Sequence, residues 1–337
     1  PFCGDKGYHA DVTLYNQKYG KEAENFFRCN KCGAAGNALK LYADYYGIST
    51  KEAIKQLNNN EAAEQVSYRR ERKADDTIVF AKPASAKDKH KTYSELLSIL
   101  TLSEEHKEDL LRRGLTEEEI VRYRYKSCPQ TSKSVKVAEE LLKRGCTLEG
   151  VAGFAQRTDG KWVFCSSNGY LIPFTDVNGV ITGLQIRTNQ KKKKYIWLSS
   201  AAVCEYEKEY NKGIKASTDP CVVGYKNQNF IFLTEGGLKA QVANRLFKKL
   251  NKDAPFVALA GVANMSSLIS TLKDLKTKGL TTVYEAYDMD KLSNEAVINA
   301  QKNVIDLCKS LDLEVKTFKW DANYKGIDDF LLSKLKG

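Results

Sequence analysis

The sequence predicts a multi-domain α/β protein whose last third forms a parallel sheet. From residue 229 onward, apolar runs of strand length alternate with amphipathic stretches of helical length. The middle of the chain mixes helical patterns with short strands, and the N-terminal region carries closely spaced cysteines. Strands that alternate with helices need crossover connections, which place the strands parallel in one sheet. We therefore expect a cysteine-containing module, a mixed α+β middle region and a C-terminal parallel sheet.

The elements of the last third follow from their hydrophobic periods. Short apolar runs bounded by turn residues predict strands, at 229–234, 256–260, 281–287 and 313–320. Stretches with an apolar residue every three or four positions predict helices, at 237–250, 265–278, 294–311 and 328–335. This strict alternation is typical of a Rossmann-like sheet.

Acidic residues follow two of the predicted strands. Glu235 ends the first strand, and Asp288 and Asp290 follow the third. Because the carboxyl ends of parallel strands meet at one edge of a sheet, these side chains can share one divalent ion. That layout suits a magnesium site for phosphoryl chemistry. An isolated Asp-x-Asp pair is more often a solvated loop or a helix cap, and the joint pattern is what favours a metal site.

The motif around these acids resembles a known module. Thr-Glu-Gly-Gly-Leu-Lys-Ala at 234–240, followed by Asp-Met-Asp at 288–290, is similar to the TOPRIM domain of topoisomerases, bacterial-type primases and some nucleases. The resemblance implies that Glu235, Asp288 and Asp290 are catalytic and bind Mg²⁺ or Mn²⁺. A further family acid follows the fourth strand, where Asp328 and Asp329 stand at a different spacing. They are weaker candidates, and Asp328 is equally explained as a helix cap.

Lys239 stands one turn into the helix that follows Glu235. Backbone N–H groups and the helix dipole favour anions at a helix N-terminus, so Lys239 can meet triphosphate or template phosphate there. The alternative is an ordinary surface cation.

Cysteines near the N-terminus predict a zinc site. Cys29 and Cys32 are two residues apart, a spacing that lets two thiolates reach one tetrahedral ion. Cys3 supplies one member of a second pair. We expect the fourth ligand to be a cysteine just before Pro1, with His9 as the substitute; three unrelated buried thiols are the alternative. The segment resembles the zinc ribbon of bacterial and phage primases, including its Gly-Asn-Ala and following helix at 36–46, and the resemblance implies a structural Zn²⁺.

The segment 169–187 predicts a hairpin with an Asn-Gly turn at 178–179. It resembles the hairpin in the RNA-polymerase region of bacterial primases, which implies that Arg187 faces nucleotide and template. Without the resemblance, Arg187 is a solvated surface charge. Four lysines ending at Lys194 precede the aromatic run 195–197 and can track a nucleic-acid backbone. A solvated hairpin tip is an equal alternative for them.

These segments divide the chain into four regions. We expect a zinc ribbon with trailing helices at 38–46 and 51–57, a polar linker with one short strand at 77–80, an N-lobe that is helical over 93–144 and mixed afterwards, and a TOPRIM domain. Thr116 is expected to cap one helix of the N-lobe, because acidic residues follow it in the first turn. The zinc ribbon with its helices takes residues 1–60, the linker 61–92, the N-lobe 93–225 and the TOPRIM domain 226–337.

Composition indicates which partners and which cellular compartment to expect. Lys and Arg number 53 against 42 Asp and Glu, a net charge of +11 that favours a nucleic-acid partner without requiring one. Nine cysteines without a pairing frame favour a reducing compartment. The sequence shows neither a leading apolar segment nor a run long enough for a bilayer, so we expect a cytoplasmic protein without a membrane partner.

The resemblance implies a DNA primase, a nucleotidyltransferase that makes RNA primers on single-stranded DNA from nucleoside triphosphates. It is closest to primases of phages and mobile elements. No helicase-type phosphate-binding loop occurs, so a partner helicase is expected on another chain or in a missing C-terminal region.

Two alternatives to a primase stay open. One is a TOPRIM nuclease or topoisomerase-like enzyme; a topoisomerase needs a nucleophilic tyrosine, and with eighteen tyrosines the composition of the chain does not exclude one. The other is a non-catalytic protein that binds single-stranded DNA.

Overall fold

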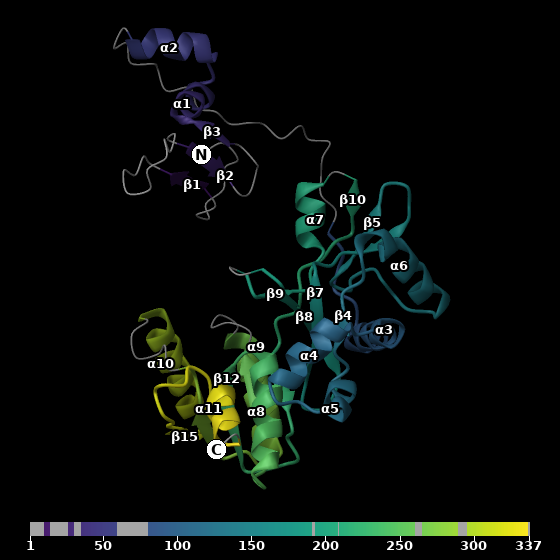
Figure 1. Cartoon of the computed structure of the whole chain (residues 1–337), viewed down its shortest axis with the longest axis vertical. Coiled ribbons are helices and arrows are strands. Elements are labelled where there is room, and N and C mark those ends of the chain that lie inside the picture. Colours follow the sequence, from purple (N-terminus) through teal and green to yellow (C-terminus); the bar gives the residue numbers. More distant parts are fainter. Residues whose placement is uncertain are drawn as a thin grey trace. The chain divides into compact units, whose positions relative to one another are not determined.

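The chain forms two compact units, residues 1–77 and 78–337, and each is described by itself. The computed structural model describes residues 10–13, 26–29, 35–58, 80–190, 193–207, 209–259, 265–288 and 295–335 (Figure 1). Several predicted features lie outside these residues, namely Cys3, His9, Cys32, Asp290, most of the linker and all but Phe80 of its short strand.

The first unit contains a small antiparallel sheet. Its strands are β1 (Ala10–Thr13), β2 (Phe26–Cys29) and β3 (Ala35–Asn37), in that order. Phe27 and Cys29 on the central strand are both buried. Cys29 therefore stands at the end of the middle strand of this sheet.

Two helices follow the small sheet, as predicted. Helix α1 (Ala38–Tyr46) begins at Asn37, whose side-chain oxygen accepts a hydrogen bond from the backbone N–H of Lys40. Helix α2 (Thr50–Asn58) begins with reciprocal hydrogen bonds between Ser49 and Glu52. Local capping chemistry thus explains why both helices start where the sequence predicts.

The second unit opens with helices. They are α3 (Ala86–Ile99), α4 (Glu104–Arg112), α5 (Glu117–Arg122) and α6 (Ser134–Lys143), with a single 3₁₀ turn before α6. Helix α3 starts seven residues before the helical region expected from residue 93, inside the expected linker. The reason is Ser85, whose hydroxyl accepts from the N–H of Asp88 and caps the helix. The cap predicted at Thr116 is confirmed, as a capping box with Glu119.

The predicted hairpin is present. Strands β7 (Gly169–Thr175) and β8 (Ile181–Thr188) pair antiparallel, flanked by β4 (Lys126–Ser127) and β9 (Tyr195–Trp197). Their connection is longer than an Asn-Gly turn. Asp176 accepts from the N–H groups of Asn178 and Val180, and Gly179 has a φ of +78°. The Asp side chain thus organises a five-residue loop between the strands.

The second unit also contains a small three-stranded sheet. Its strands, in spatial order, are β10 (Tyr210–Asn211), β5 (Phe154–Arg157) and β6 (Trp162–Phe164). Helix α7 (Ala201–Tyr206) precedes β10. Strands β5 and β6 contribute with α3, α6 and the hairpin to a core that includes Tyr93, Leu141 and Phe154. Helix α7 and β10 pack on the other side of β5, in a small cluster with Ala155.

The C-terminal sheet has five strands in the order β11-β13-β12-β14-β15. Their bounds are β11 (Cys221–Val223), β12 (Phe230–Glu235), β13 (Phe256–Leu259), β14 (Thr282–Glu285) and β15 (Glu314–Thr317). The four predicted strands are confirmed and run parallel. The fifth strand, β11, was not predicted as part of this sheet; it lies before residue 226 and pairs antiparallel with β13.

Helices cover both faces of this sheet. On one face α8 (Gly237–Lys249) and α11 (Ile327–Lys334) lie side by side (Figure 1), and Leu246 and Leu331 pack with Phe232. On the other face lie α9 (Met265–Thr277) and α10 (Glu295–Ser310). Alternate residues of β12 point to opposite faces, so Ile231 and Leu233 join the second core. This is a doubly wound α/β arrangement.

One core joins the middle region to the C-terminal sheet. Tyr125 and Phe174 pack in the same buried cluster as Phe232 and Leu246. The expected division between residues 225 and 226 thus falls within one packed unit. No helix in the described part of this chain has the length and apolarity needed to cross a bilayer.

Candidate active site

Glu235 lies where β12 turns into α8. Gly236 makes the turn with a φ of +88°, and its N–H donates to the carbonyl oxygen of Leu259 at 2.7 Å. Gly237 must also be small, because a Cβ there would lie 2.6 Å from Cε2 of Phe174. The two glycines let the strand enter the helix directly, which puts Glu235 at the carboxyl edge of the sheet.

Asp288 reaches the same edge from β14. That strand ends at Glu285, two residues earlier than predicted, because the N–H of Tyr287 bonds to the Glu285 carboxylate at 2.9 Å. The ammonium group of Lys239 forms an ion pair with Oδ1 of Asp288. The two side chains are only 18% and 13% exposed. A lysine one turn into α8 therefore holds Asp288 in a largely dry setting.

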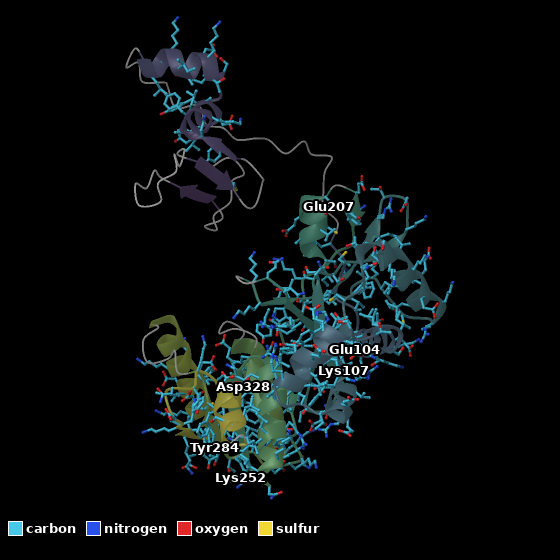
Figure 2. All side chains as sticks on the ribbon, in the orientation of Figure 1. Glu104, Lys107, Glu207, Lys252, Tyr284 and Asp328 are labelled. Carbon is cyan, nitrogen blue, oxygen red and sulfur yellow. The ribbon has the colours of Figure 1, made fainter. Side chains whose placement is uncertain are left out.

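Asp328 adds a further carboxylate to this cluster. It lies in the first turn of α11 (Figure 2), and its Oδ1 is shielded from solvent without a hydrogen-bond partner among the described residues. Burial raises the pKa of Asp328 to about 6; the charge of Lys239 opposes this shift, while those of Asp329 and Asp288 reinforce it. Asp329 itself is exposed. The structure thus brings Asp288, Lys239 and Asp328 together and leaves Asp329 in solvent.

The charge of Glu235 lies close enough to influence the pKa of Tyr287, the residue before Asp288. Burial is the main cause that raises the pKa of Tyr287, and the charges of Glu285 and Glu235 add to it. Within the described ranges, no three Asp, Glu, His or Cys side chains stand close enough to hold one metal ion. Since Asp290 lies outside those ranges, the shared ligand set of Glu235, Asp288 and Asp290 stays a prediction.

Glu285 is a site residue that the sequence analysis missed. Its side chain is fully buried, and it accepts the hydrogen bond from Tyr287 that shapes the turn toward Asp288. The available signal was a lone acid inside an apolar strand, where a charge is costly unless it is well paired. The Glu285 side chain therefore helps to fix the backbone of the segment that carries Asp288.

A cavity of about 400 Å³ gathers two of the predicted cations. Arg187 and Lys194 both line it, and the guanidinium of Arg187 lies 4.8 Å from the ring centroid of Tyr195. This lining also includes Tyr170, which precedes Phe174 by four residues on β7, a distance of ~13 Å along the strand. One strand thus connects the cavity with the edge that carries Glu235.

The wall of this cavity contains a polar network that the sequence did not reveal. Tyr170 donates to Oδ2 of Asp109 at 2.9 Å, and Nε of Arg113 donates to the same oxygen at 3.0 Å. Burial acts to raise the pKa of Asp109, but Arg113 and Tyr170 hold it below the usual range. The network fixes α4 against β7, and no motif indicates it because Tyr170 lies 61 residues from Asp109 in sequence.

Comparisons with known proteins agree with this architecture. Residues 222–336 match the family described as "Domain of unknown function (DUF3854)". The chain is 28% identical over 158 residues to a DNA primase of Thermotoga maritima; the match covers 44% of this chain and 27% of that protein. The chain therefore spans about a quarter of the length of this relative.

Solved structures share the fold. The zinc-binding and RNA polymerase domains of the Aquifex aeolicus primase match with a TM-score of 0.54 at 20% identity, over 98% of this chain and 78% of that one. The RNA polymerase domain of Mycobacterium tuberculosis primase DnaG, in complex with a double-stranded DNA with a 6-nucleotide overhang, matches with a TM-score of 0.52 at 13% identity. That match covers 75% of this chain and 81% of the other.

The described fold is thus of the class seen in primase RNA polymerase domains, a mixed α/β unit with a partly parallel sheet. In sequence and in fold together, the chain resembles bacterial DNA primases.

Proposed function

We propose that this chain is part of a DNA primase, which synthesises short RNA primers on a single-stranded DNA template by nucleotidyl transfer. The observation that carries the proposal is the cluster of Asp288, Lys239 and Asp328 at the carboxyl edge of the sheet, on a primase-type fold. A relative named DNA primase supports it further. Phosphoryl transfer needs positioned charge more than covalent chemistry, and this edge concentrates charged groups in a dry setting.

The carboxylates of this edge fit a hard divalent cation. Carboxylate oxygens are the preferred protein ligands of Mg²⁺, and the unpartnered Oδ1 of Asp328 leaves one acceptor beside Asp288 unused. In the proposed TOPRIM-type site, Glu235, Asp288 and Asp290 hold the ion, with Asp328 and Asp329 as weaker candidates. When bound, Mg²⁺ or Mn²⁺ lowers the charge on a triphosphate and aligns it with the attacking hydroxyl.

Cations of this unit are proposed to hold the nucleotide and template. Arg187 and Lys194 line one cavity, and the aromatic ring of Tyr195 beside Arg187 offers a surface for a base. Lys239, at the N-terminal turn of α8, is the candidate nearest the acids. In this arrangement the cavity binds the strand and the acidic edge performs the transfer.

The first unit is proposed to be a zinc ribbon that engages the single-stranded template. Cys29 ends the central strand of its sheet and is buried, which suits a structural ligand. Cys3, Cys32 and either a cysteine before Pro1 or His9 complete the proposed set. Modification of the thiols should release zinc, which a zinc-responsive dye detects. Absence of released zinc would contradict this part of the proposal.

A primer-synthesis assay tests the function. Purified protein is incubated with single-stranded DNA of varied sequence, Mg²⁺ and labelled nucleoside triphosphates, and we expect short RNA products. Asp288→Ala should abolish dinucleotide synthesis and leave DNA binding largely intact. Asp274→Ala, at an exposed position on α9, is the matched control and should retain synthesis.

The same assay separates the alternatives. Cleavage or relaxation of DNA without consumption of triphosphates would assign the chain to the nuclease or topoisomerase class instead. Binding of DNA with no product from the unaltered protein would indicate a non-catalytic binding protein. Normal synthesis by Asp288→Ala would refute the proposed site.

A further inference from the structure

Lys239 is the cation that pairs with Asp288 when no metal ion is bound. Its ammonium group contacts Oδ1 of Asp288, and both side chains are more than four-fifths buried. Lys239 therefore occupies an oxygen that the proposed metal ion needs. A divalent ion bound to Asp288 would place like charges side by side, which favours movement of the ammonium group away from this carboxylate.

Asp328 offers a second acceptor oxygen close to the ammonium group of Lys239. Nζ of Lys239 lies 3.5 Å from the point where a Cβ of residue 326 would stand, and Oδ1 of Asp328 is closer still to that point. The two atoms are therefore separated by less than twice that distance. This Oδ1 is buried and has no hydrogen-bond partner in the described part of the chain. An acceptor without a hydrogen-bond partner thus lies near the ammonium group that pairs with Asp288.

The absence of a side chain at Gly326 keeps this path open. A Cβ at that position would crowd both Oδ1 of Asp328 and Cε of Lys239, the latter at 3.3 Å. Helix α11 can therefore bring its first turn against the Lys239 side chain. The ammonium group of Lys239 thus has Asp288 as its present partner and Oδ1 of Asp328 nearby.

We propose that Lys239 is an exchangeable cation that pairs with Asp288 in the metal-free protein and moves to Asp328 when a divalent metal binds Asp288. The inference rests on the proposed function, because it assumes a metal at this edge. Exchange gives the displaced ammonium group a carboxylate partner in the metal-bound state, which matters because an unpaired buried charge is costly. Lys239 is thereby a positioning residue that sets the metal affinity of the site, and Asp328, the weaker candidate for the metal, serves as the acceptor of Lys239 instead.

Direct metal binding tests the exchange. Mn²⁺ is titrated into the purified full chain without nucleotide or DNA, and free Mn²⁺ is measured by electron paramagnetic resonance. Lys239→Met removes the competing cation and keeps most of the side-chain volume, so we expect Mn²⁺ binding about three- to tenfold tighter than in the unaltered chain. Lys249→Met is the control on the last turn of the same helix, ~15 Å along its axis, and should leave the affinity unchanged. Figure 2 labels Lys252, which follows the end of α8 by three residues, apart from Asp328.

A double-mutant cycle identifies Asp328 as the acceptor. Asp328→Asn should weaken Mn²⁺ binding about threefold when Lys239 is present, because the displaced ammonium group then has no carboxylate to meet. In the Lys239→Met background the same substitution should have no effect. If Asp328→Asn weakens Mn²⁺ binding equally in both backgrounds, Asp328 is a direct ligand and the exchange is refuted.

The remaining outcomes separate this inference from the proposed function. Equal Mn²⁺ affinity of the unaltered chain and Lys239→Met would overturn the exchange while leaving the metal site in place. Failure of both proteins to bind Mn²⁺ would overturn the metal site and with it the proposed function. Asp288→Asn should eliminate the tight Mn²⁺ site in either background, and retention of that site would also overturn the proposed function.

Discussion

Gln241 of α8 donates a hydrogen bond from Nε2 to the carbonyl oxygen of Pro173 on β7, at 3.1 Å in the buried core. The Oε1 of the same side chain accepts a hydrogen bond from the hydroxyl of Tyr125. One amide thus joins the hairpin and the helical region to the helix that begins beside Glu235. The acidic edge is positioned by this junction as well as by its own strands.

Gln241→Met should therefore destabilise the second unit. The substitution keeps the volume but leaves the hydroxyl of Tyr125 and the carbonyl of Pro173 without their partner in the core. We expect a loss of about 2–4 kcal/mol in the free energy of unfolding, measured by urea denaturation. Gln156→Met on β5, which removes an exposed hydrogen bond to the carbonyl oxygen of Gly160, should cost less than about 1 kcal/mol. Equal losses in the two variants would contradict the role of the junction.

Gly237→Ala should strain the entry into α8. The new methyl group would meet the buried ring of Phe174, which also contacts Trp197, so overpacking should cost about 1–3 kcal/mol in unfolding free energy. Phe174→Leu makes room for the methyl group, and in that background Gly237→Ala should cost less than about 1 kcal/mol. Thermal or urea unfolding of the four proteins measures this coupling. An unchanged cost in both backgrounds would mean that the ring does not set the requirement for glycine.

Asp328→Asn should stabilise the metal-free protein only at high pH. Burial raises the pKa of Asp328 from 3.8 to about 6, so ionisation is less favourable in the folded protein than in the unfolded chain. Below about pH 4 the carboxyl is protonated in both states and contributes no difference. Between about pH 4 and 6 the unfolded chain ionises while the folded protein keeps its proton, so the unaltered protein loses stability over this range and the variant should gain about 1–2 kcal/mol above about pH 6. Unfolding in the presence of a chelator over this pH range provides the measurement.

The exposed neighbour provides the control for that pH dependence. Asp329→Asn removes an acid from the same helical turn, but from a side chain in solvent. Its effect on unfolding free energy should vary much less over the same pH range. A gain for Asp328→Asn that is constant at every pH would indicate a packing effect instead of a titration.

Arg187→Ala should weaken binding of single-stranded DNA. Loss of one phosphate contact should reduce affinity about three- to tenfold and lower the slope of log affinity against log salt by about 1. Fluorescence anisotropy of a labelled oligonucleotide at several salt concentrations measures both quantities. Arg157→Ala removes an arginine on β5 that pairs with Asp159, outside the cavity lining, and should change neither. If the two variants behave alike, the cavity is not the template site.

Local patterns predicted most of the architecture. The alternation of strands and helices after residue 229 is confirmed within one or two residues for α8, β13, α9 and α11. Hydrophobic period and capping residues act over a few positions, so they can be read without knowledge of the fold. The placement of Glu235 and Asp288 at one edge also followed from strand direction alone, because every parallel strand ends on the same side.

Other features depended on packing that no local pattern encodes. The edge strand β11 is short and pairs with β13 across the 32 residues 224–255. The early start of α3 is different, because the local cap at Ser85 encodes it. The cavity that joins Arg187 to Lys194, and the network of Asp109 with Tyr170, form only when α4 packs on β7.

The sequence by itself determined the α/β class, the parallel strands and the acids at their ends, because these follow from backbone periodicity and chain direction. Only the tertiary structure decided that Lys239 pairs with Asp288 and that Oδ1 of Asp328 is shielded from solvent near them. The pair requires β14 to lie beside β12, and the position of Asp328 requires α11 to dock against α8, which brings together residues almost ninety positions apart. The protonation of one acid and the partner of another therefore depend on long-range packing, since charge is stabilised or penalised by neighbours in space.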